Sequence, residues 1–217
     1  MDQDFILTLV DDSRSARSMQ KQIGPSEIGG CKRRTWHRVQ GHPVINETLS
    51  MAAWMGTAIH SAIEKKIRRI DPFSEQYLLE EPATVGDLTG HVDCYDIENR
   101  EVIDWKTTTK RRLADFPSEQ QRWQVQVYGY LMRGNGYPVD TVTLVGIPRD
   151  GNETHVKIHS EPYYESVAIK ALEWLASVRS SVDPPEPTEH VRFCRDYCSF
   201  YNPRADDDGD GCPGGGR

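Results

Sequence analysis

The sequence TGHVDCYDIENREVIDWKT, residues 89–107, decides the fold that we expect for this chain. Residues 89–95 and 101–107 each alternate between apolar and polar side chains, which is typical of β-strands with one face against a core. The polar residues Glu98-Asn99 or Asn99-Arg100 favour a tight turn between them. The stretch is therefore predicted to form an antiparallel β-hairpin, and Leu78-Leu79 indicates the start of a strand before it.

The hairpin brings three charged residues together. A two-residue turn at Glu98-Asn99 would pair Asp93 directly with Asp104, and the Cβ atoms of such a pair lie roughly 5 Å apart. Two carboxylates at that spacing repel each other unless a cation lies between them. Lys106 follows Asp104 by two residues, so its side chain points to the same face of the strand.

Two aspartates and a lysine on one strand face suit the hydrolysis of phosphodiester bonds. Carboxylate oxygens bind hard cations such as Mg²⁺ or Mn²⁺, and such a cation polarises the phosphate and lowers the pKa of a water ligand. The lysine orients that water or neutralises charge that develops on the phosphate. Taken alone, Asp104 and Lys106 are more often a cross-strand ion pair at a protein surface, so other residues have to support the site.

Two helices are predicted beside the hairpin. Isoleucines at helical spacing form one apolar stripe over residues 49–70, a segment that carries His60 and ends before Pro72. Residues 119–133 also have helical spacing and place Gln124 and Tyr128 four residues apart on one face. Ordinary packing of these polar side chains against a sheet would produce the same pattern.

Strands and a further helix follow the second of these helices. Strands are predicted at residues 141–147 and 154–158, around Asp150-Gly151, and a helix is predicted over residues 163–181. We therefore expect an α/β (α+β) fold in which helices flank a central mixed β-sheet.

The side-chain patterns at the two ends of the chain predict less regular secondary structure. Residues 1–24 indicate a weakly ordered start or a short helix, and a second short helix is expected from Ser26, its cap, with Cys31 near its end. The last 30 residues, rich in Asp, Gly and Pro, are expected to be irregular without a covalent or metal link. We expect one domain over residues 1–217, with a core at residues 25–182 and a cysteine-containing tail at residues 183–217.

The composition indicates a soluble globular protein. Hydrophobic residues make up 37% and charged residues 27% of the chain, and no apolar run reaches the roughly 18 residues of a membrane helix. The N-terminus lacks the basic start of a secretory signal, so we expect a cytoplasmic location. The net charge of −7 argues mildly against nucleic acid, although basic residues cluster at residues 32–34, 65–69 and 110–112. Each cluster is equally consistent with a solvated surface.

Four motifs occur along the chain in a characteristic order. They are Gly56-Thr57-Ala58-Ile59-His60, Gly90-His91-Val92-Asp93, Ile103-Asp104-Trp105-Lys106-Thr107 and Gln124-Val125-Gln126-Val127-Tyr128. Their order and spacing resemble the RecB-like branch of the PD-(D/E)xK nucleases, and the resemblance extends from about residue 26 to residue 212. The resemblance implies that the central sheet is the restriction-endonuclease-like core of that family.

The resemblance also implies a role for each motif. His60 and the two aspartates would bind the metal ion, and Lys106 would be the catalytic lysine. A histidine ligand favours transition metals, so Mn²⁺ would compete with Mg²⁺. The helical glutamine and tyrosine would arrange the site and contact DNA. Gln126 and Tyr130 have the same spacing as Gln124 and Tyr128, so the register of this last motif has an alternative. The implied catalytic and metal-binding residues are His60, Asp93, Asp104, Lys106, Gln124 and Tyr128.

Five cysteines form a second pattern. Disulfides are rare in the cytoplasm, and Cys94 is expected to be buried in the strand next to Asp93. Four thiolates suffice for one [4Fe–4S] cluster or one structural zinc ion. The resemblance extends to CRISPR-associated, phage and helicase–nuclease exonucleases with one cysteine before the nuclease core and three after it. It implies a [4Fe–4S] cluster that ties the tail to the first helix; zinc and free tail cysteines are the alternatives. The implied ligands are Cys31, Cys194, Cys198 and Cys212.

These patterns lead to a functional hypothesis. We expect a Mg²⁺- or Mn²⁺-dependent DNA exonuclease that prefers single-stranded ends, and the resemblance leans toward 5′-to-3′ digestion. A structure-specific endonuclease on the same core and a non-catalytic DNA-binding adaptor are the alternatives. Trp36, Trp105 and Tyr128 are candidates for stacking on bases. No P-loop motif is present, so a helicase or recombination protein would have to supply unwound DNA. Repair, recombination and a phage or prokaryotic origin are compatible with this chemistry, and the oligomeric state stays open.

Overall fold

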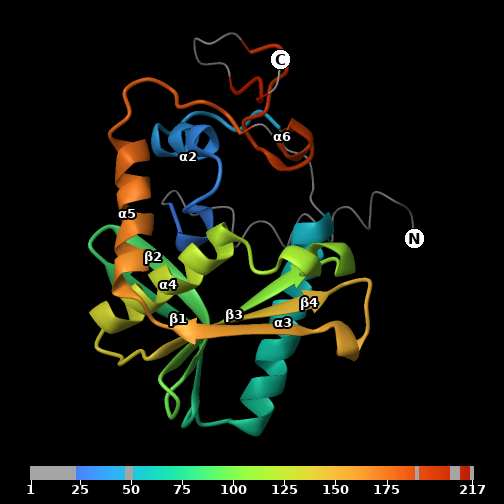
Figure 1. Cartoon of the computed structure of the whole chain (residues 1–217), viewed down its shortest axis with the longest axis vertical. Helices are drawn as coiled ribbons and strands as arrows, with labels where there is room; N and C mark the ends of the chain where they lie inside the picture. The colour runs from blue at the N-terminus through green and yellow to red at the C-terminus, as the bar shows by residue number, and fades with distance from the viewer. Residues whose placement is uncertain (1–22, 47–50, 189–190, 206–210, 216–217) are drawn as a thin grey trace. The chain divides into compact units, whose positions relative to one another are not determined.

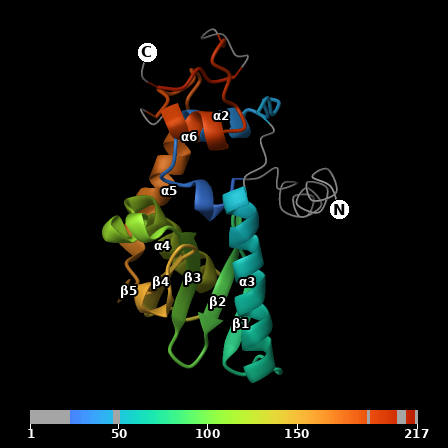
Figure 2. The ribbon, with the colours of Figure 1, turned by 90° about the vertical axis from the view of Figure 1, so that its right-hand side faces the viewer.

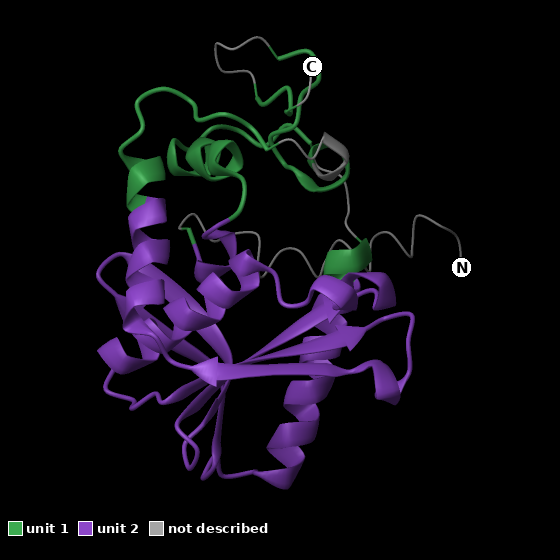
Figure 3. Cartoon of the chain, in the orientation of Figure 1, with its two compact units in different colours: residues 1–23, 30–54, 176–217 green, residues 24–29, 55–175 purple. Residues whose placement is uncertain are grey.

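The computed structural model describes residues 23–46, 51–188, 191–205 and 211–215. The chain divides into two compact units (Figure 3). The sheet unit comprises Gly24–Gly29 and Met55–Leu175, and the cysteine unit comprises Met1–Ile23, Gly30–Trp54 and Ala176–Arg217. The predicted short helix or weakly ordered start at residues 1–24 lies almost entirely outside the described residues.

The sheet unit is built on one mixed sheet of five strands, which lie side by side in chain order (Figure 1). Only the neighbours β3 and β4 run parallel; the other three pairs are antiparallel. The predicted mixed sheet flanked by helices is confirmed. The strands are β1 (Tyr77–Val85), β2 (Leu88–Asp96), β3 (Glu101–Thr108), β4 (Thr141–Pro148) and β5 (Lys157–Pro162).

The hairpin of β2 and β3 has the predicted register, because Cys94 pairs with Ile103. The predicted two-residue turn is wrong, however, because the last pair is Asp96 with Glu101. The Asp96 carboxylate accepts hydrogen bonds from the backbone N–H of Asn99 at 3.0 Å and from its side-chain amide at 2.9 Å. These bonds stabilise a wider loop over residues 97–100.

Three long helices lie close to their predicted positions: α3 (Met51–Ile70), α4 (Glu119–Gly134) and α5 (Glu165–Arg179). The strands lie between α4 on one side and α3 on the other (Figure 2). Val125, Val127 and Leu131 of α4 are buried against the sheet. The isoleucine stripe of α3 is at most half-buried, and its last member, Ile70, is 66% exposed.

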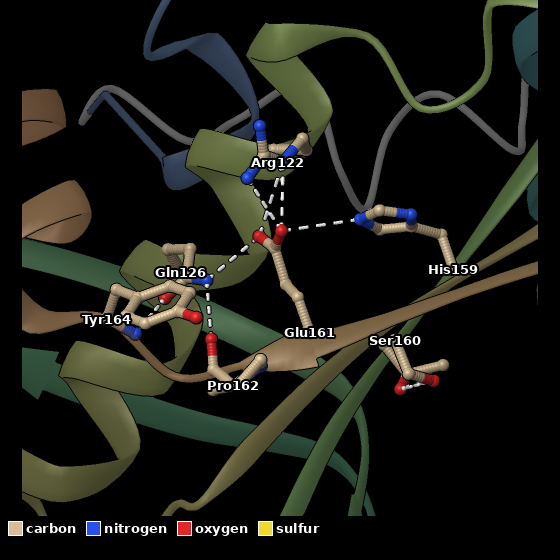
Figure 4. Close-up of polar contacts among 8 residues, drawn as sticks. Arg122, Gln126, His159, Ser160, Glu161, Pro162 and Tyr164 are labelled. Carbon is tan, nitrogen blue, oxygen red and sulfur yellow. Dashed lines mark hydrogen bonds and ion pairs between the residues drawn. The ribbon is translucent and has the colours of Figure 1, made fainter.

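Helix α4 has two well-defined attachments. Its N-terminus carries a capping box, in which Ser118 accepts from the N–H of Gln121 and the Gln121 side chain accepts from the N–H of Ser118. Further along, Arg122 and Gln126 both donate to Glu161 of the edge strand β5, at 2.7 and 2.9 Å (Figure 4). These contacts hold the helix against the edge of the sheet.

Three expectations for the shorter elements are wrong. Pro25–Glu27 forms only a 3₁₀ turn, η1, because Gly29 takes a left-handed backbone conformation at φ +79° and redirects the chain. Cys31 therefore caps the start of α2 (Lys32–Val39) instead of lying near the end of a helix.

The other two differences lie further along the chain. The strand predicted from residue 154 begins at Lys157, because Asn152 caps the 3₁₀ helix η3 (Glu153–His155). A helix, α6 (Val191–Tyr197), occupies part of the tail that was expected to be irregular. In addition, η2 (Lys110–Asp115) follows β3. No helix within the described ranges combines the length and the hydropathy that a membrane span requires.

Candidate active site

The candidate active site lies where β2 and β3 separate. Their ladder ends at the pair Cys94–Ile103, one step before Asp93 and Asp104. The Asp93 carboxylate accepts the backbone N–H of Trp105 at 2.9 Å. The Asp93 side chain thus takes the place of a backbone acceptor of β2 for this N–H. Both aspartates lie where the backbone pairing of β2 and β3 ends.

Asp104 is the most buried carboxylate of this site, with 1% of its surface exposed. Its Oδ1 atom accepts from the Lys106 Nζ at 3.0 Å and from the Gln124 amide at 3.4 Å. Its Oδ2 atom lies 2.7 Å from the same Nζ but outside hydrogen-bond geometry. Burial, reinforced by the charge of Asp93, raises the pKa of Asp104 to about 6 against the opposing effect of Lys106.

His60 of α3 approaches Asp93 from the next element, with 3.4 Å between Nδ1 and the carboxylate Oδ2. Burial lowers the pKa of His60, but the adjacent Asp93 carboxylate outweighs it and raises that pKa above its ordinary value. Burial conversely favours a neutral Asp93, yet His60, Lys106 and the N–H of Trp105 hold the pKa of Asp93 below its ordinary value. Asp93 is therefore ionised at neutral pH.

Glu80 joins this group although the sequence analysis did not select it. The ligand atoms of His60, Glu80 and Asp93 all lie within 4.8 Å of one another. Glu80 lies opposite Asp93, between the pairs Leu79–Cys94 and Glu81–Val92, and has φ +52° inside β1. A left-handed backbone costs a non-glycine residue roughly 1–2 kcal/mol and is typical of functional sites.

A signal for Glu80 was present in the sequence. Val85-Gly86-Asp87-Leu88 has the form of a two-residue hairpin turn, and the structure pairs Val85 with Leu88 there. That register places Glu80 opposite Asp93. Leu78-Leu79 predicts only the start of the preceding strand, so the turn at its end does not follow from these two residues.

Gln124 and Tyr128 of α4 face the carboxylates. The Gln124 amide lies 3.2 Å from the Tyr128 hydroxyl as well as near Asp104. Burial raises the pKa of Tyr128 above its ordinary value, so the phenol stays protonated. The alternative pair is directed elsewhere, because Gln126 binds Glu161. The ring of Tyr128 lies against Gly90, where an added Cβ would be 2.9 Å from Cε1.

Two of the three candidates for base stacking are packed inside the protein. Tyr128 is 7% exposed, and so is Trp36, which donates its Nε1–H to the backbone oxygen of Ser181 at 2.9 Å. Trp105 is half-buried next to the aspartates. Only Trp105 therefore has surface that a base could contact.

The predicted cysteine ligands lie together in the cysteine unit. Cys194, Cys198 and Cys212 are each at most 3% exposed, and Cys31 is half-buried. Burial raises the pKa of Cys194 to about 11, and the neighbouring thiols of Cys198, Cys31 and Cys212 raise it further. No three of these sulfurs lie within 4.8 Å of one another, since the described residues contain only the His60 group at that spacing.

Backbone contacts also connect the start and the tail of the cysteine unit. The N–H groups of Ile45 and Asn46 both donate to the oxygen of Ser199 at 2.9 Å, and Cys198 N–H donates to the oxygen of Cys194 at 3.0 Å. Cys94, by contrast, lies in β2 of the sheet unit and is 1% exposed, as expected for a core residue.

Comparison with known proteins gives a consistent result. The sequence pattern of the PD-(D/E)XK nuclease superfamily matches residues 68–202. The structure of a protein named SSO0001 is similar, with a TM-score of 0.57 and 19% identity over 92% of this chain and 94% of that chain. An alkaline exonuclease from Laribacter hongkongensis has a TM-score of 0.51 and 10% identity over 77% of this chain and 90% of that chain. These two likenesses show the fold alone. No curated protein matches the sequence.

Proposed function

The chain belongs to the PD-(D/E)XK nuclease superfamily, and we propose that it is a DNA exonuclease that depends on Mg²⁺ or Mn²⁺. It would act on single-stranded ends in the 5′-to-3′ direction. The observation that supports catalysis most directly is the pairing of a buried Asp104 with Lys106, next to an ionised Asp93. A non-catalytic adaptor has no need for these three charges at the end of a strand pair.

The residues at this point fit a divalent cation. The buried Oδ2 of Asp104 accepts no hydrogen bond and lies 2.7 Å from the Lys106 ammonium, whose positive charge compensates for burial of the carboxylate. Asp93 and Glu80 supply hard oxygen donors and His60 supplies a nitrogen donor within 4.8 Å of one another, a set that suits Mn²⁺ as well as Mg²⁺. Asp104 lies outside this group and is proposed as a further ligand on the resemblance alone. A cation bound there would polarise the scissile phosphate and lower the pKa of a water ligand.

The protein's own groups then have separate tasks. Lys106 donates to a phosphate oxygen or to the attacking water, and its ion pair with Asp104 keeps the ammonium in place. Gln124 orients Asp104 through its amide, and Tyr128 in turn lies within hydrogen-bond distance of Gln124. Asp93 is held by His60 and by the N–H of Trp105. This arrangement pre-organises the carboxylates before substrate binds.

We further propose that Cys31, Cys194, Cys198 and Cys212 hold a [4Fe–4S] cluster. A tetrahedral zinc site with Zn–S bonds of about 2.3 Å requires all four sulfurs to lie within about 4 Å of one another. The four sulfurs do not reach that spacing, so the proposal of a cluster rests on the arrangement of one cysteine before the nuclease core and three after it. Iron and zinc analysis of protein purified without oxygen distinguishes the two, together with the visible absorption of a brown protein.

End-labelled DNA tests the proposed activity. Single- and double-stranded substrates, labelled at either end, are incubated with Mn²⁺, Mg²⁺ or EDTA. We expect metal-dependent shortening of the single strand, with a pattern of labelled products that reports 5′-to-3′ digestion, and no cutting by Asp104→Asn or Lys106→Ala. Asp140→Asn is the matched control, because its side chain is 65% exposed in a surface pair with Arg100.

Three outcomes would change the proposal. Cutting of a closed circular single strand would identify an endonuclease on the same site. Shortening from the 3′ end would reverse the proposed direction. Intact substrates with folded wild-type protein in both metals would remove the enzymatic proposal altogether.

A further inference from the structure

The 3₁₀ helix η2, which follows the strand that carries Lys106, contains three consecutive cationic residues. β3 ends at Thr108, two residues after Lys106, and η2 begins at Lys110 and continues with Arg111 and Arg112. Four residues of extended chain span at most about 14 Å. The η2 cations, as we call these three residues, are therefore close to the proposed site of phosphodiester cleavage.

Parallel pairing with β4 fixes the start of η2. Thr108 pairs with Pro148, and the backbone N–H of Arg149 donates to the oxygen of Thr108 at 2.9 Å. The backbone N–H of Lys110 donates to the carboxylate of Asp150 at 2.7 Å. The segments that leave the two parallel strands are thus joined to each other directly.

Core contacts fix the rest of η2. Leu113 is 8% exposed and Phe116 is 7% exposed. Both pack over Gly146 of β4, where an added Cβ would be 2.8 Å from Leu113 Cδ2. Lys157 of β5 donates its Nζ–H to the oxygen of Leu113 at 3.1 Å. η2 therefore presents its charges from a backbone that is attached at both ends.

Among the residues that the structure describes, the η2 cations have no partner for their charges. Their side chains are exposed and form no hydrogen bond or ion pair with the residues that the structure describes. Some exposed cations of the sheet unit do have partners, such as Arg68 with Glu64. Asp150 accepts the backbone N–H of Lys110, and within the described residues neither Asp150 nor Asp115 forms an ion pair with the side chains of the η2 cations.

These observations point to an anionic ligand with several charges. Three adjacent like charges repel one another, and a polyanion that contacts all of them removes this repulsion. With a net charge of −7, the protein repels DNA at long range, so cations are needed locally where a strand is held. The η2 cations follow the end of β3, which carries Lys106, so a DNA strand bound at the proposed site lies within reach of them.

We propose that Lys110, Arg111 and Arg112 bind consecutive backbone phosphates of the DNA strand that is cut, within a few nucleotides of the scissile bond. This inference rests on the proposed nuclease function and adds the location of the substrate strand. Contacts of this kind position the strand without reading its sequence. They contribute to DNA affinity and to its salt dependence, and not to the chemical step.

Salt-dependent binding and cleavage kinetics of the full chain test the inference. A triple variant, K110A/R111A/R112A, is compared with K65A/K66A/R69A, which removes the same charge from exposed positions of α3. Affinity for a labelled single-stranded oligonucleotide is measured by fluorescence anisotropy in EDTA over a range of salt concentrations. Single-strand contacts contribute a slope of roughly 0.7 each, so loss of three lowers the slope by about 2.

The expected results differ between the two variants. K110A/R111A/R112A raises KM on the order of 10-fold or more with kcat retained, and its salt slope is shallower. K65A/K66A/R69A shifts both quantities much less. The charge-preserving variant K110R/R111K/R112K restores binding, which a purely structural role of these side chains would not allow.

Each remaining outcome has a definite meaning. Equal salt slopes in the two alanine variants overturn the location that we propose, even when the wild type cuts DNA. A loss of kcat with unchanged KM in K110A/R111A/R112A also overturns it. Wild type that binds DNA through the η2 cations and cuts nothing contradicts the proposed nuclease function alone.

Discussion

Glu80 is the site residue whose conformation is hardest to explain by packing. A glutamate in a left-handed conformation within a strand is unfavourable by roughly 1–2 kcal/mol, and its partners His60 and Asp93 belong to the proposed metal site. We therefore predict that Glu80→Gln weakens cation binding. The Mn²⁺ concentration for half-maximal cleavage is expected to rise about 10-fold or more, as measured by metal titration of the cleavage rate.

Glu81→Gln is the control for this prediction. Its side chain points to the other face of β1 and accepts a hydrogen bond from the Tyr137 hydroxyl at 3.1 Å. An equal change in metal requirement for both variants would assign the effect to general weakening of β1. Unchanged metal dependence in Glu80→Gln would remove Glu80 from the proposed ligand set.

How far the sequence predicts the site depends on the kind of residue. Asp93, Asp104 and Lys106 were selected because the alternation of two strands places them on one face, and the structure brings them together. Glu80 was missed because its strand was recognised from only two leucines. The pKa of Asp104 could not be predicted at all, because it depends on burial by elements distant in the sequence.

Glu161 shows how a single edge strand is joined to the helix that carries Gln124. It accepts hydrogen bonds from Arg122, Gln126 and His159 and is 11% exposed. Burial favours the neutral acid, but these three donors outweigh it and hold the pKa of Glu161 below its ordinary value of 4.5. The ionised form therefore stabilises the attachment of β5 to α4.

This leads to a prediction about stability in acid. Because the pKa is lower in the folded than in the unfolded protein, the stabilisation is complete above the unfolded value and is lost as pH falls through the folded value. Glu161→Gln is expected to lower the free energy of unfolding at neutral pH by about 1–3 kcal/mol. The variant is also expected to lose less stability than wild type on acidification, as followed by thermal unfolding at several pH values.

Glu165→Gln is the matched control, because Glu165 is 62% exposed and lies 3.9 Å from Arg133. An exposed pair of this kind contributes little, so we expect a melting temperature close to that of wild type. Identical melting curves for Glu161→Gln and wild type at all pH values would show that the Glu161 contacts do not stabilise the fold.

Some features of the helices and strands follow from side-chain periodicity, and others do not. Long helices and the register of β2 with β3 follow from side-chain spacing. The loop over residues 97–100 does not, because the Asp96 carboxylate decides its length by capturing Asn99. The start of α2, which Cys31 precedes as the N-cap, likewise depends on the left-handed backbone conformation of Gly29.

At the scale of the whole molecule, the two units carry different chemistry. All proposed catalytic residues belong to the sheet unit, and all four proposed cluster ligands belong to the cysteine unit. The proposed cluster would join the segment that begins at Cys31 to a tail that starts more than a hundred residues later. A cluster that closes so long a loop restricts the unfolded chain and stabilises the folded cysteine unit.

The last prediction concerns removal of that cluster. Cys198→Ser is expected to reduce the iron content and to lower the melting temperature of the cysteine unit, because folding and ligand binding are coupled. The sheet unit has its own core, so cation binding at Asp93 and Asp104 is expected to persist. Calorimetry should then show two transitions in the variant, only one of them shifted. Isothermal titration with Mn²⁺ measures cation binding at Asp93 and Asp104.

Cys94→Ala is the control, because it is expected to destabilise the sheet unit and to leave the proposed cluster in place. Cys94 is buried in β2 and is not among the proposed ligands, so the variant is expected to retain its iron while the transition of the sheet unit moves to lower temperature. A Cys198→Ser protein with full iron content would contradict the proposed ligand set. One shared transition that shifts equally in both variants would show that the two units unfold together, and that the cluster stabilises the nuclease core as well as the tail.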